Sequence, residues 1–389
     1  MKDLSSTGFE DILIVDDTPA NLRLLSQMLT SHGYKVRAVT NGSRALESVQ
    51  TLPPDLILLD IRMPVLNGYE VCERLKAEEE TREIPIIFIS ALDDIQDKVR
   101  AFKTGGVDYI TKPFQIEEIL ARIQTHLALR KLQVQLEAAN KRFEHELLVA
   151  GRMQKSFLPR KMQDLCGWQI AFKLQPARET SGDFYDIFHL PGNRLGILIA
   201  DVVDKGVGAA LFMALSWTLI RTYSAQFPES PETVLQAANQ RILTDSGVRQ
   251  FVTLFYGVLG LDNGTLIYSN AGHNPPLLVT GDNLKNIQKL TRTGRPLGIF
   301  VDETWQRKSA QINPGDLFFL YTDGITETHN EAGEPFGEAG LISSIQANSG
   351  ESVEKIKDRI ISEVCEFAGP CRPDDDIAII VIKREDNTT

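Results

Sequence analysis

Five short apolar runs alternate with amphipathic stretches in the first third of the chain. They lie at residues 12–15, 35–39, 55–60, 84–90 and 107–110. Buried strands of this length that are separated by helices form a parallel sheet with helices on both faces. We therefore predict a doubly wound, flavodoxin-like α/β domain over residues 9–128. Ligands of such sheets bind beyond the carboxyl ends of the strands, so functional side chains are expected directly after the runs.

A long helical pattern follows this domain. Residues 115–157 contain no proline, and their one glycine is Gly151. Positions spaced alternately by three and four are apolar with one polar exception: Leu129, Leu132, Leu136, Ala139, Phe143, Glu146, Ala150, Met153 and Phe157. Sustained spacing of this kind is typical of a coiled coil. We predict a helical coiled-coil linker over residues 129–160 that pairs two copies in a homodimer. A single amphipathic helix folded back on one domain is the alternative.

The pattern changes again in the last part of the chain. Longer, often alternating strands appear, and Asp262-Asn263-Gly264 separates the runs 251–261 and 265–270 as a tight hairpin turn would. Helical patterns cover residues 207–223, 231–244 and 352–367. Segregated strands and helices predict an antiparallel α+β domain over residues 161–385, a sandwich flanked by helices.

Composition narrows the classes of function. The 389 residues carry a net charge of −11 and contain no tract rich in lysine or arginine, so nucleic acid is not an expected partner. Every apolar stretch is shorter than the ~20 residues that span a bilayer, and the first residues lack an export signal. We expect a cytoplasmic protein with no membrane partner. The four cysteines are scattered and are expected to be free thiols.

Acidic residues follow the apolar runs of the first domain. Asp16 and Asp17 follow the first run, Asp60 and Ser90 end the third and fourth, and Lys112 follows the fifth. Carboxylates that meet at one sheet edge repel each other unless a cation lies between them, and oxygen ligands favour Mg²⁺. With the ion and a lysine offsetting charge, Asp60 can act as the nucleophile toward a phosphoryl group.

These residues, in this order, make residues 10–128 resemble a response-regulator receiver domain. The loop IRMPVLNGYE at 61–70 also fits that family. The resemblance implies that Asp60 is phosphorylated by a sensor histidine kinase and that Asp16 and Asp17 help it to bind Mg²⁺. It further implies that Ser90 and Lys112 contact the phosphoryl group. Tyr109 would be the aromatic switch residue that senses phosphorylation.

The last domain carries four acidic clusters at loop positions, in residues 181–186, 200–206, 322–324 and 374–376. Asp201 and Asp323 lie where apolar strands end. Clustered aspartates without histidine or cysteine favour Mg²⁺ or Mn²⁺ over zinc. Two such ions can hold a bridging water, lower its pKa and direct the resulting hydroxide at a phosphate ester. This interpretation needs no protein nucleophile.

Together with NAGHNPPL at 270–277, GRPLG at 294–298 and YTDGITETHN at 321–330, the clusters resemble the SpoIIE-like branch of the metal-dependent PPM protein phosphatases over residues 147–384. The resemblance implies that Asp201 bridges two metal ions with help from the Val202 carbonyl. It implies that Asp323 and Asp375 hold one of the metal ions and that Asp183 binds metal directly or through water. Arg178 would bind the phosphate. Asp186 and Asp376 receive no separate roles, and His273 is interpreted as structural. Departures from the family pattern are Ser181, the Val203-Asp204 pair before Lys205, and Ala378.

The sequence thus predicts a response regulator whose phosphorylation controls a phosphatase that uses Mn²⁺ or Mg²⁺. Its substrate would carry phosphoserine or phosphothreonine, and the family resemblance favours an anti-sigma-factor antagonist. The alternative is a non-catalytic adaptor that binds a phosphorylated partner through a phosphatase-like domain. A DNA-binding regulator is not favoured because no basic recognition helix follows the first domain.

Overall fold

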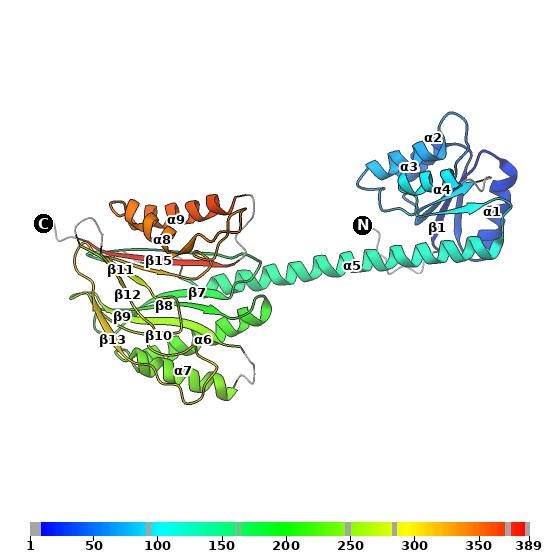
Figure 1. The fold of residues 1–389 in the computed structure, drawn as a ribbon. Helices are drawn as coiled ribbons and strands as arrows, with labels where there is room; N and C mark the ends of the chain where they lie inside the picture. Colours follow the sequence, from blue (N-terminus) through cyan, green and yellow to red (C-terminus); the bar gives the residue numbers. More distant parts are fainter. Residues whose placement is uncertain are drawn as a thin grey trace. The chain divides into compact units, whose positions relative to one another are not determined.

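A computed structural model describes residues 9–90, 95–159, 162, 165–245, 250–281, 286–369 and 375–385. The chain divides into two units between Arg142 and Phe143. Helix α5 (Ile116–Phe157) runs through this division (Figure 1). Within the described residues, no helix is both long enough and apolar enough to cross a membrane.

The N-terminal unit is built on one parallel sheet of order β2-β1-β3-β4-β5. Its strands are β1 (Asp11–Val15), β2 (Lys35–Val39), β3 (Leu56–Asp60), β4 (Ile86–Ser90) and β5 (Asp108–Thr111). Its helices are α1 (Pro19–Ser31), α2 (Gly42–Thr51), α3 (Gly68–Ala77), α4 (Ile95–Lys103) and the first part of α5. Separate apolar cores on the two faces of the sheet confirm the predicted doubly wound domain.

Local sequence signals fix some of these boundaries. Helix α3 starts with a capping box, in which the Asn67 side chain accepts from Glu70 N–H while the Glu70 carboxylate accepts from Asn67 N–H. The two bonds satisfy backbone donors that a helix start otherwise leaves open. The loop after Asp60 therefore ends at a defined point beside the sheet edge.

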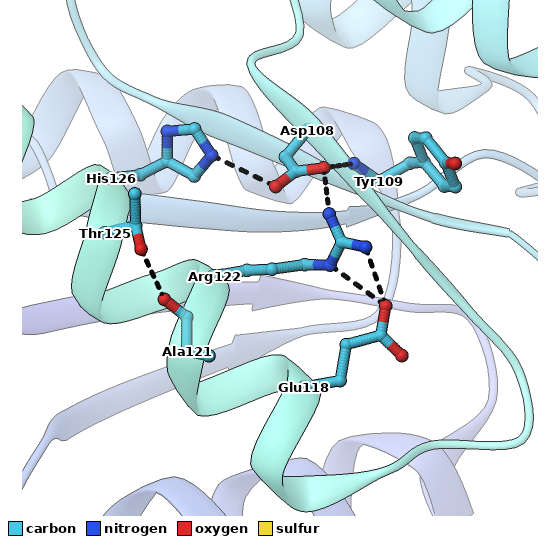
Figure 2. Close-up of polar contacts among 7 residues, drawn as sticks. All are labelled: Asp108, Tyr109, Glu118, Ala121, Arg122, Thr125 and His126. Carbon is cyan, nitrogen blue, oxygen red and sulfur yellow. Dashed lines mark hydrogen bonds and ion pairs between the residues drawn. The ribbon is translucent and has the colours of Figure 1, made fainter.

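Polar contacts fasten the start of α5 to β5 (Figure 2). Asp108 accepts from Arg122 Nη1 at 2.5 Å and pairs with His126 Nε2 at 3.2 Å, while Arg122 also binds Glu118. These contacts hold the pKa of Asp108 below its usual value, since the hydrogen bonds outweigh the opposing effect of burial. The first turns of α5 are thus tied to the strand that carries Tyr109.

Helix α5 continues without a break for 42 residues. Ile119, Ile123 and Leu127 are buried in the core of the N-terminal unit. Further along, five members of the predicted apolar stripe are more than half exposed: Leu129, Leu132, Leu136, Phe143 and Met153. The long helix is present as predicted, whereas pairing of its stripe with a second copy stays a prediction.

The C-terminal unit contains two antiparallel five-stranded sheets packed face to face. One has the order β13-β10-β9-β8-β7 and the other β12-β11-β14-β15-β6. The strands are β6 (Trp168–Gln175), β7 (Asp183–Leu190), β8 (Arg194–Val202), β9 (Val252–Gly260), β10 (Thr265–Ala271), β11 (Leu277–Thr280), β12 (Asn286–Lys289), β13 (Lys308–Gln311), β14 (Leu317–Tyr321) and β15 (Ile377–Arg384). Residues such as Phe255, Phe318 and Ile380 fill the core between the sheets.

Helices cover the outer faces of this sandwich (Figure 1). Helices α6 (Val207–Gln226) and α7 (Pro231–Asp245) pack on the β7–β10 sheet, and α8 (Gly337–Ala347) and α9 (Val353–Ala368) pack on the other. The hairpin predicted at Asp262-Asn263-Gly264 joins β9 to β10. The predicted antiparallel α+β domain is confirmed.

Candidate functional site

Three aspartates gather at the carboxyl edge of the N-terminal sheet. Ligand oxygens of Asp16, Asp17 and Asp60 all lie within 4.8 Å of one another. Lys112 Nζ lies 3.0 Å from Asp16 Oδ2 and 3.1 Å from Asp60 Oδ2. The sheet order explains the cluster, because β1 and β3 are neighbours and both end here. An all-oxygen set of this kind suits a hard divalent ion such as Mg²⁺.

The charges of this cluster are coupled. Burial, assisted by Asp16, raises the pKa of Asp60, and Lys112 opposes the rise. Burial would lower the pKa of Lys112, but its hydrogen bonds to Asp16 and Asp60 raise it overall. Asn21, which sequence reasoning missed, donates to both oxygens of Asp16 and so fixes that carboxylate.

The remaining predicted residues of this unit lie on the adjoining strands. Ser90 ends β4 and is buried, and its carbonyl accepts from Lys112 N–H at 2.9 Å. The Tyr109 ring, on β5, lies beside α4, with Lys98 Nζ 4.6 Å from the ring centroid. Strand order thus brings Ser90 to the edge with the acids and leaves Tyr109 on the side that faces α4.

A second group of acids lies at one end of the C-terminal sandwich. Asp183 and Asp201 are directly opposite each other in the antiparallel register of β7 and β8. Asp323 follows β14 and Asp375 precedes β15, and both of these strands belong to the other sheet. Of the acidic run predicted at 374–376, Asp374 lies outside the described residues. Both sheets therefore contribute carboxylates to the same end of the domain.

The electrostatics of this group favour a bound cation. Burial and then the neighbouring Asp201 raise the pKa of Asp183 well above its usual value. Burial, followed by Asp323, raises the pKa of Asp201 to about 7, and burial also raises the pKa of Asp323. Asp183 Oδ2 is buried and accepts no hydrogen bond from the described residues. Buried carboxylates without partners are costly, and a divalent ion is the natural compensation.

The two acidic groups differ in spacing. Over the described part of the chain, three ligand oxygens lie within 4.8 Å of one another only in the N-terminal trio. In the C-terminal unit, Asp201, Asp375 and Asp376 instead line a pocket of about 520 Å³, together with Val202 and the exposed Arg178 and Lys205. Lys205 Nζ lies 2.9 Å from Asp375 Oδ1. A wider acidic pocket fits ions together with a ligand better than it fits one ion alone.

Comparison with known families agrees with both domains. Residues 12–124 match the response regulator receiver domain, and residues 191–385, half of the chain, match the family described as Stage II sporulation protein E (SpoIIE). The chain belongs to the SpoIIE family. It contains a receiver domain fused to a SpoIIE domain, and these two names are used below.

Individual relatives cover parts of this arrangement. Protein IcfG of Synechocystis sp. is 34% identical over 265 residues, which are 61% of this chain and 41% of that protein. The DNA-binding dual master transcriptional regulator RpaA of the same organism is 44% identical over 116 residues, 30% of this chain and 48% of RpaA. The chain therefore spans less than half the length of these curated relatives. The SiaA-PP2C domain of Pseudomonas aeruginosa, 22% identical, covers 64% of this chain and 99% of its own with a TM-score of 0.57, which supports the fold alone.

Asp376, to which the sequence gave no separate role, acts as a clamp in the SpoIIE domain. Its carboxylate accepts from Ala177 N–H at 2.7 Å, Ser181 Oγ at 2.8 Å and Gly182 N–H at 2.8 Å. A Cβ at Gly324 would clash with the Asp376 carbonyl oxygen, which explains the glycine after Asp323. Ser181, a departure from the family pattern, thus supplies one of the three bonds that fix the loop before Asp183.

Asp186, which lies three residues after Asp183 on β7, has a different role. It is fully buried and accepts from Arg221 Nε at 2.6 Å, and the Arg221 guanidinium lies over the Phe188 and Trp217 rings. Burial raises the pKa of Asp186, and Arg221 opposes the rise. The pair therefore anchors α6 to β7. Arg221 was missed, although it is the one charged residue of the apolar helix α6, and a lone charge of this kind indicates a buried partner.

The end of α5 lies directly against the same loop. The Gln154 amide donates to the Ser181 carbonyl oxygen and accepts from Ser181 N–H at 3.0 Å. A Cβ at Gly151 would clash with the Glu179 carbonyl oxygen, so the helix can approach this closely only with glycine there. The loop that leads to Asp183 is thus held by Asp376 on one side and by α5 on the other.

His273 of the NAGHNPPL motif is buried beside β9. Its Nδ1 lies 2.9 Å from Thr253 Oγ1, and its backbone N–H donates to Asn270 Oδ1 at 2.8 Å. Burial lowers the pKa of His273 to about 3, so the imidazole is neutral. Thr253 is opposite Asp201 in the sheet, and His273 therefore supports the strand next to the acids.

Proposed function

We propose that phosphorylation of Asp60 controls a metal-dependent phosphatase that removes phosphate from serine or threonine of a partner protein. The observation that carries the proposal is a group of acids around Asp201. Asp183 lies opposite Asp201 in the β7–β8 register, Asp375 lines the same pocket as Asp201, and the charge of Asp323 helps to raise the pKa of Asp201. The acidic trio of the receiver domain, with Lys112 beside it, supports control by phosphorylation.

The proposed donor set fits Mn²⁺ or Mg²⁺, because it is made of carboxylate and carbonyl oxygens and includes Asp183 Oδ2, which accepts no hydrogen bond from the described residues. Asp201 with the Val202 carbonyl, Asp323, Asp375 and Asp183 would hold the ions. Bound divalent ions would activate a water molecule and offset the charge of the phosphate ester.

The other residues of the pocket bind and orient the reactants. Arg178, in the pocket lining, would bind the phosphate of the substrate. Asp376 and Gln154 keep the loop before Asp183 in place, so that the acids keep their mutual positions. The proposed reaction therefore depends on the geometry of residues 177–183.

In the receiver domain, Asp60 would take the phosphoryl group from a sensor histidine kinase. Mg²⁺ on Asp16, Asp17 and Asp60 would offset the charge there, and Lys112 would bind the phosphoryl oxygens. Ser90 and Tyr109 would then respond to the new charge. Helix α5, tied to β5 through Asp108, is the proposed route to the SpoIIE domain.

Domain boundaries and partners belong to the same proposal. The receiver would cover residues 9–128, the linker 129–160 and the phosphatase 161–385, although residues 160 and 161 lie outside the described part. The exposed stripe of α5 would pair with a second copy as a coiled coil in a homodimer. An anti-sigma-factor antagonist is the proposed substrate.

The proposal is tested with the full chain and a phosphorylated anti-sigma-factor antagonist. Phosphate release is measured in Mn²⁺, in Mg²⁺ and in chelator, before and after chemical phosphorylation of the receiver. We expect metal-dependent release at a rate that changes when the receiver is phosphorylated. Binding of the phosphoprotein without any release, in either metal, would instead support the adaptor.

A further inference from the structure

Lys205 lies in the short loop between β8 and α6. The residues on both sides have left-handed backbone conformations, with φ of 81° at Asp204 and 89° at Gly206. Such angles turn the chain sharply, and they are unfavourable for Asp204 because it has a Cβ. The turn leaves Lys205 in the lining of the acidic pocket, with its Nζ 2.9 Å from Asp375 Oδ1.

The pocket has few positive charges for the reaction that we propose. Its lining includes Asp201, Asp375 and Asp376, and the cations of the same lining are Arg178 and Lys205. A phosphate ester dianion that approaches these acids is repelled unless positive charge lies beside them. The Lys205 ammonium pairs with Asp375, so its charge lies directly beside one of these acids, although both side chains are partly exposed.

The ion pair has a second consequence. A divalent ion on Asp375 and the Lys205 ammonium would bind the same carboxylate group. Because like charges repel, each weakens the binding of the other to Asp375. An ammonium displaced from Asp375 stays in the lining of the pocket, where its charge attracts phosphate oxygens.

We propose that Lys205 binds the phosphate of the substrate and competes with the divalent ion for Asp375. This inference rests on the proposed phosphatase function and adds a substrate-binding residue to it. The sequence motif gave Lys205 no role, and Arg178, the proposed phosphate ligand, belongs to the same lining.

The test uses the full chain with Lys205→Met, which keeps the length of the side chain without its charge, and Lys205→Arg, which keeps the charge. Lys355→Met is the control, because Lys355 forms an exposed ion pair of similar length with Glu351, at 2.8 Å. Calorimetry first measures Mn²⁺ binding, and then binding of inorganic phosphate to the Mn²⁺-saturated protein. Hydrolysis of p-nitrophenyl phosphate gives KM and kcat separately.

Lys205→Met should bind Mn²⁺ about two- to fivefold more tightly, the range of a partly exposed ion pair. Inorganic phosphate should bind about tenfold more weakly or worse, as expected for loss of a hydrogen bond to a charged group. KM should rise in parallel with little change in kcat, Lys205→Arg should restore phosphate binding, and Lys355→Met should match the wild type.

Unchanged or weaker Mn²⁺ binding in folded Lys205→Met would overturn the competition. Unchanged phosphate affinity would overturn the phosphate contact. If the wild type hydrolyses neither p-nitrophenyl phosphate nor a phosphoprotein, the proposed function fails, and the two calorimetric measurements still decide the role of Lys205.

Discussion

Gln154 gives a direct test of how helix α5 acts on the SpoIIE domain. Its side chain is 6% exposed and forms both of its hydrogen bonds with the backbone of Ser181. Gln154→Leu keeps a good helix former of similar size but removes both bonds. The N–H and carbonyl groups of Ser181 then lose their partner inside the protein, directly before Asp183.

The size of the effect follows from burial. Each buried polar group without a partner costs about 1–3 kcal/mol, so holding the loop unchanged would cost about 2–6 kcal/mol. A loop that moves toward water avoids this cost but leaves its position on Asp376. Since about 1.4 kcal/mol is a factor of ten, even the smaller cost lowers the population of the present arrangement about thirtyfold. We expect kcat/KM to fall by about that factor or more.

The assay compares Gln154→Leu with Lys155→Leu, the same replacement at the exposed next position of the helix. Hydrolysis of p-nitrophenyl phosphate is measured in Mn²⁺, and circular dichroism verifies the fold. Lys155→Leu should behave as the wild type. A folded Gln154→Leu protein with the same kcat/KM as Lys155→Leu would refute the argument that α5 holds the loop before Asp183.

Four further predictions concern the acids, the receiver, the buried histidine and the linker. Asp323→Asn should lower turnover in Mn²⁺ by about a hundredfold or more, because an amide cannot replace a charged metal ligand; normal turnover by the folded variant would contradict this. Asp60→Asn should gain no acid-labile phosphate from acetyl phosphate, and labelling at the wild-type rate would exclude Asp60 as the acceptor. His273 has a pKa of about 3 in the folded protein and an ordinary value of 6.5, so only the unfolded chain takes up a proton at this residue as the pH falls from 6.5 to 5. The free energy of unfolding, measured by urea unfolding with tryptophan fluorescence, should therefore fall by about 2 kcal/mol from pH 7.5 to 5 relative to His273→Asn. An equal pH dependence in both proteins would disprove the buried neutral state. Seven residues inserted after Ala138 should preserve regulation of phosphatase rate by the receiver better than four, because seven keep the heptad in phase; equal regulation in both would rule out a mechanism based on helix register.

Much of the fold could be predicted because burial leaves a periodic pattern. The run at 55–60 became β3, and the helical pattern at 231–244 became α7 with one more residue at its end. Helix α8 was missed because Gly337, Gly340 and two serines lower its helix propensity. Packing of Leu341 and Ile345 against α9 and the sheet stabilises it instead. That contribution comes from residues far away in the sequence.

In the candidate sites, too, some features could be predicted from the sequence and others could not. Acids that follow strands could be found because the ends of neighbouring strands meet, and Asp16 and Asp60 do come together. The separate roles of Asp186 and Asp376 could not be found, since both are acids in similar loops or strand starts. Only their partners distinguish them: a guanidinium for Asp186, and two backbone amides with a hydroxyl for Asp376.

Gln154 shows most clearly what a sequence pattern cannot predict. Its position on α5 also concerns how the receiver domain would control the SpoIIE domain. A buried glutamine in a helix gives no periodic signal, because its function comes from backbone groups 27 residues away. Helix α5 is fastened to β5 near its start by Asp108 and Arg122, and to the loop before Asp183 near its end by Gly151 and Gln154. A change at β5 that altered the position of α5 would therefore reach residues 179–183 through one continuous helix. Simple tethering of the two domains would need neither set of contacts, and their presence at both ends favours α5 as the element that transmits the signal.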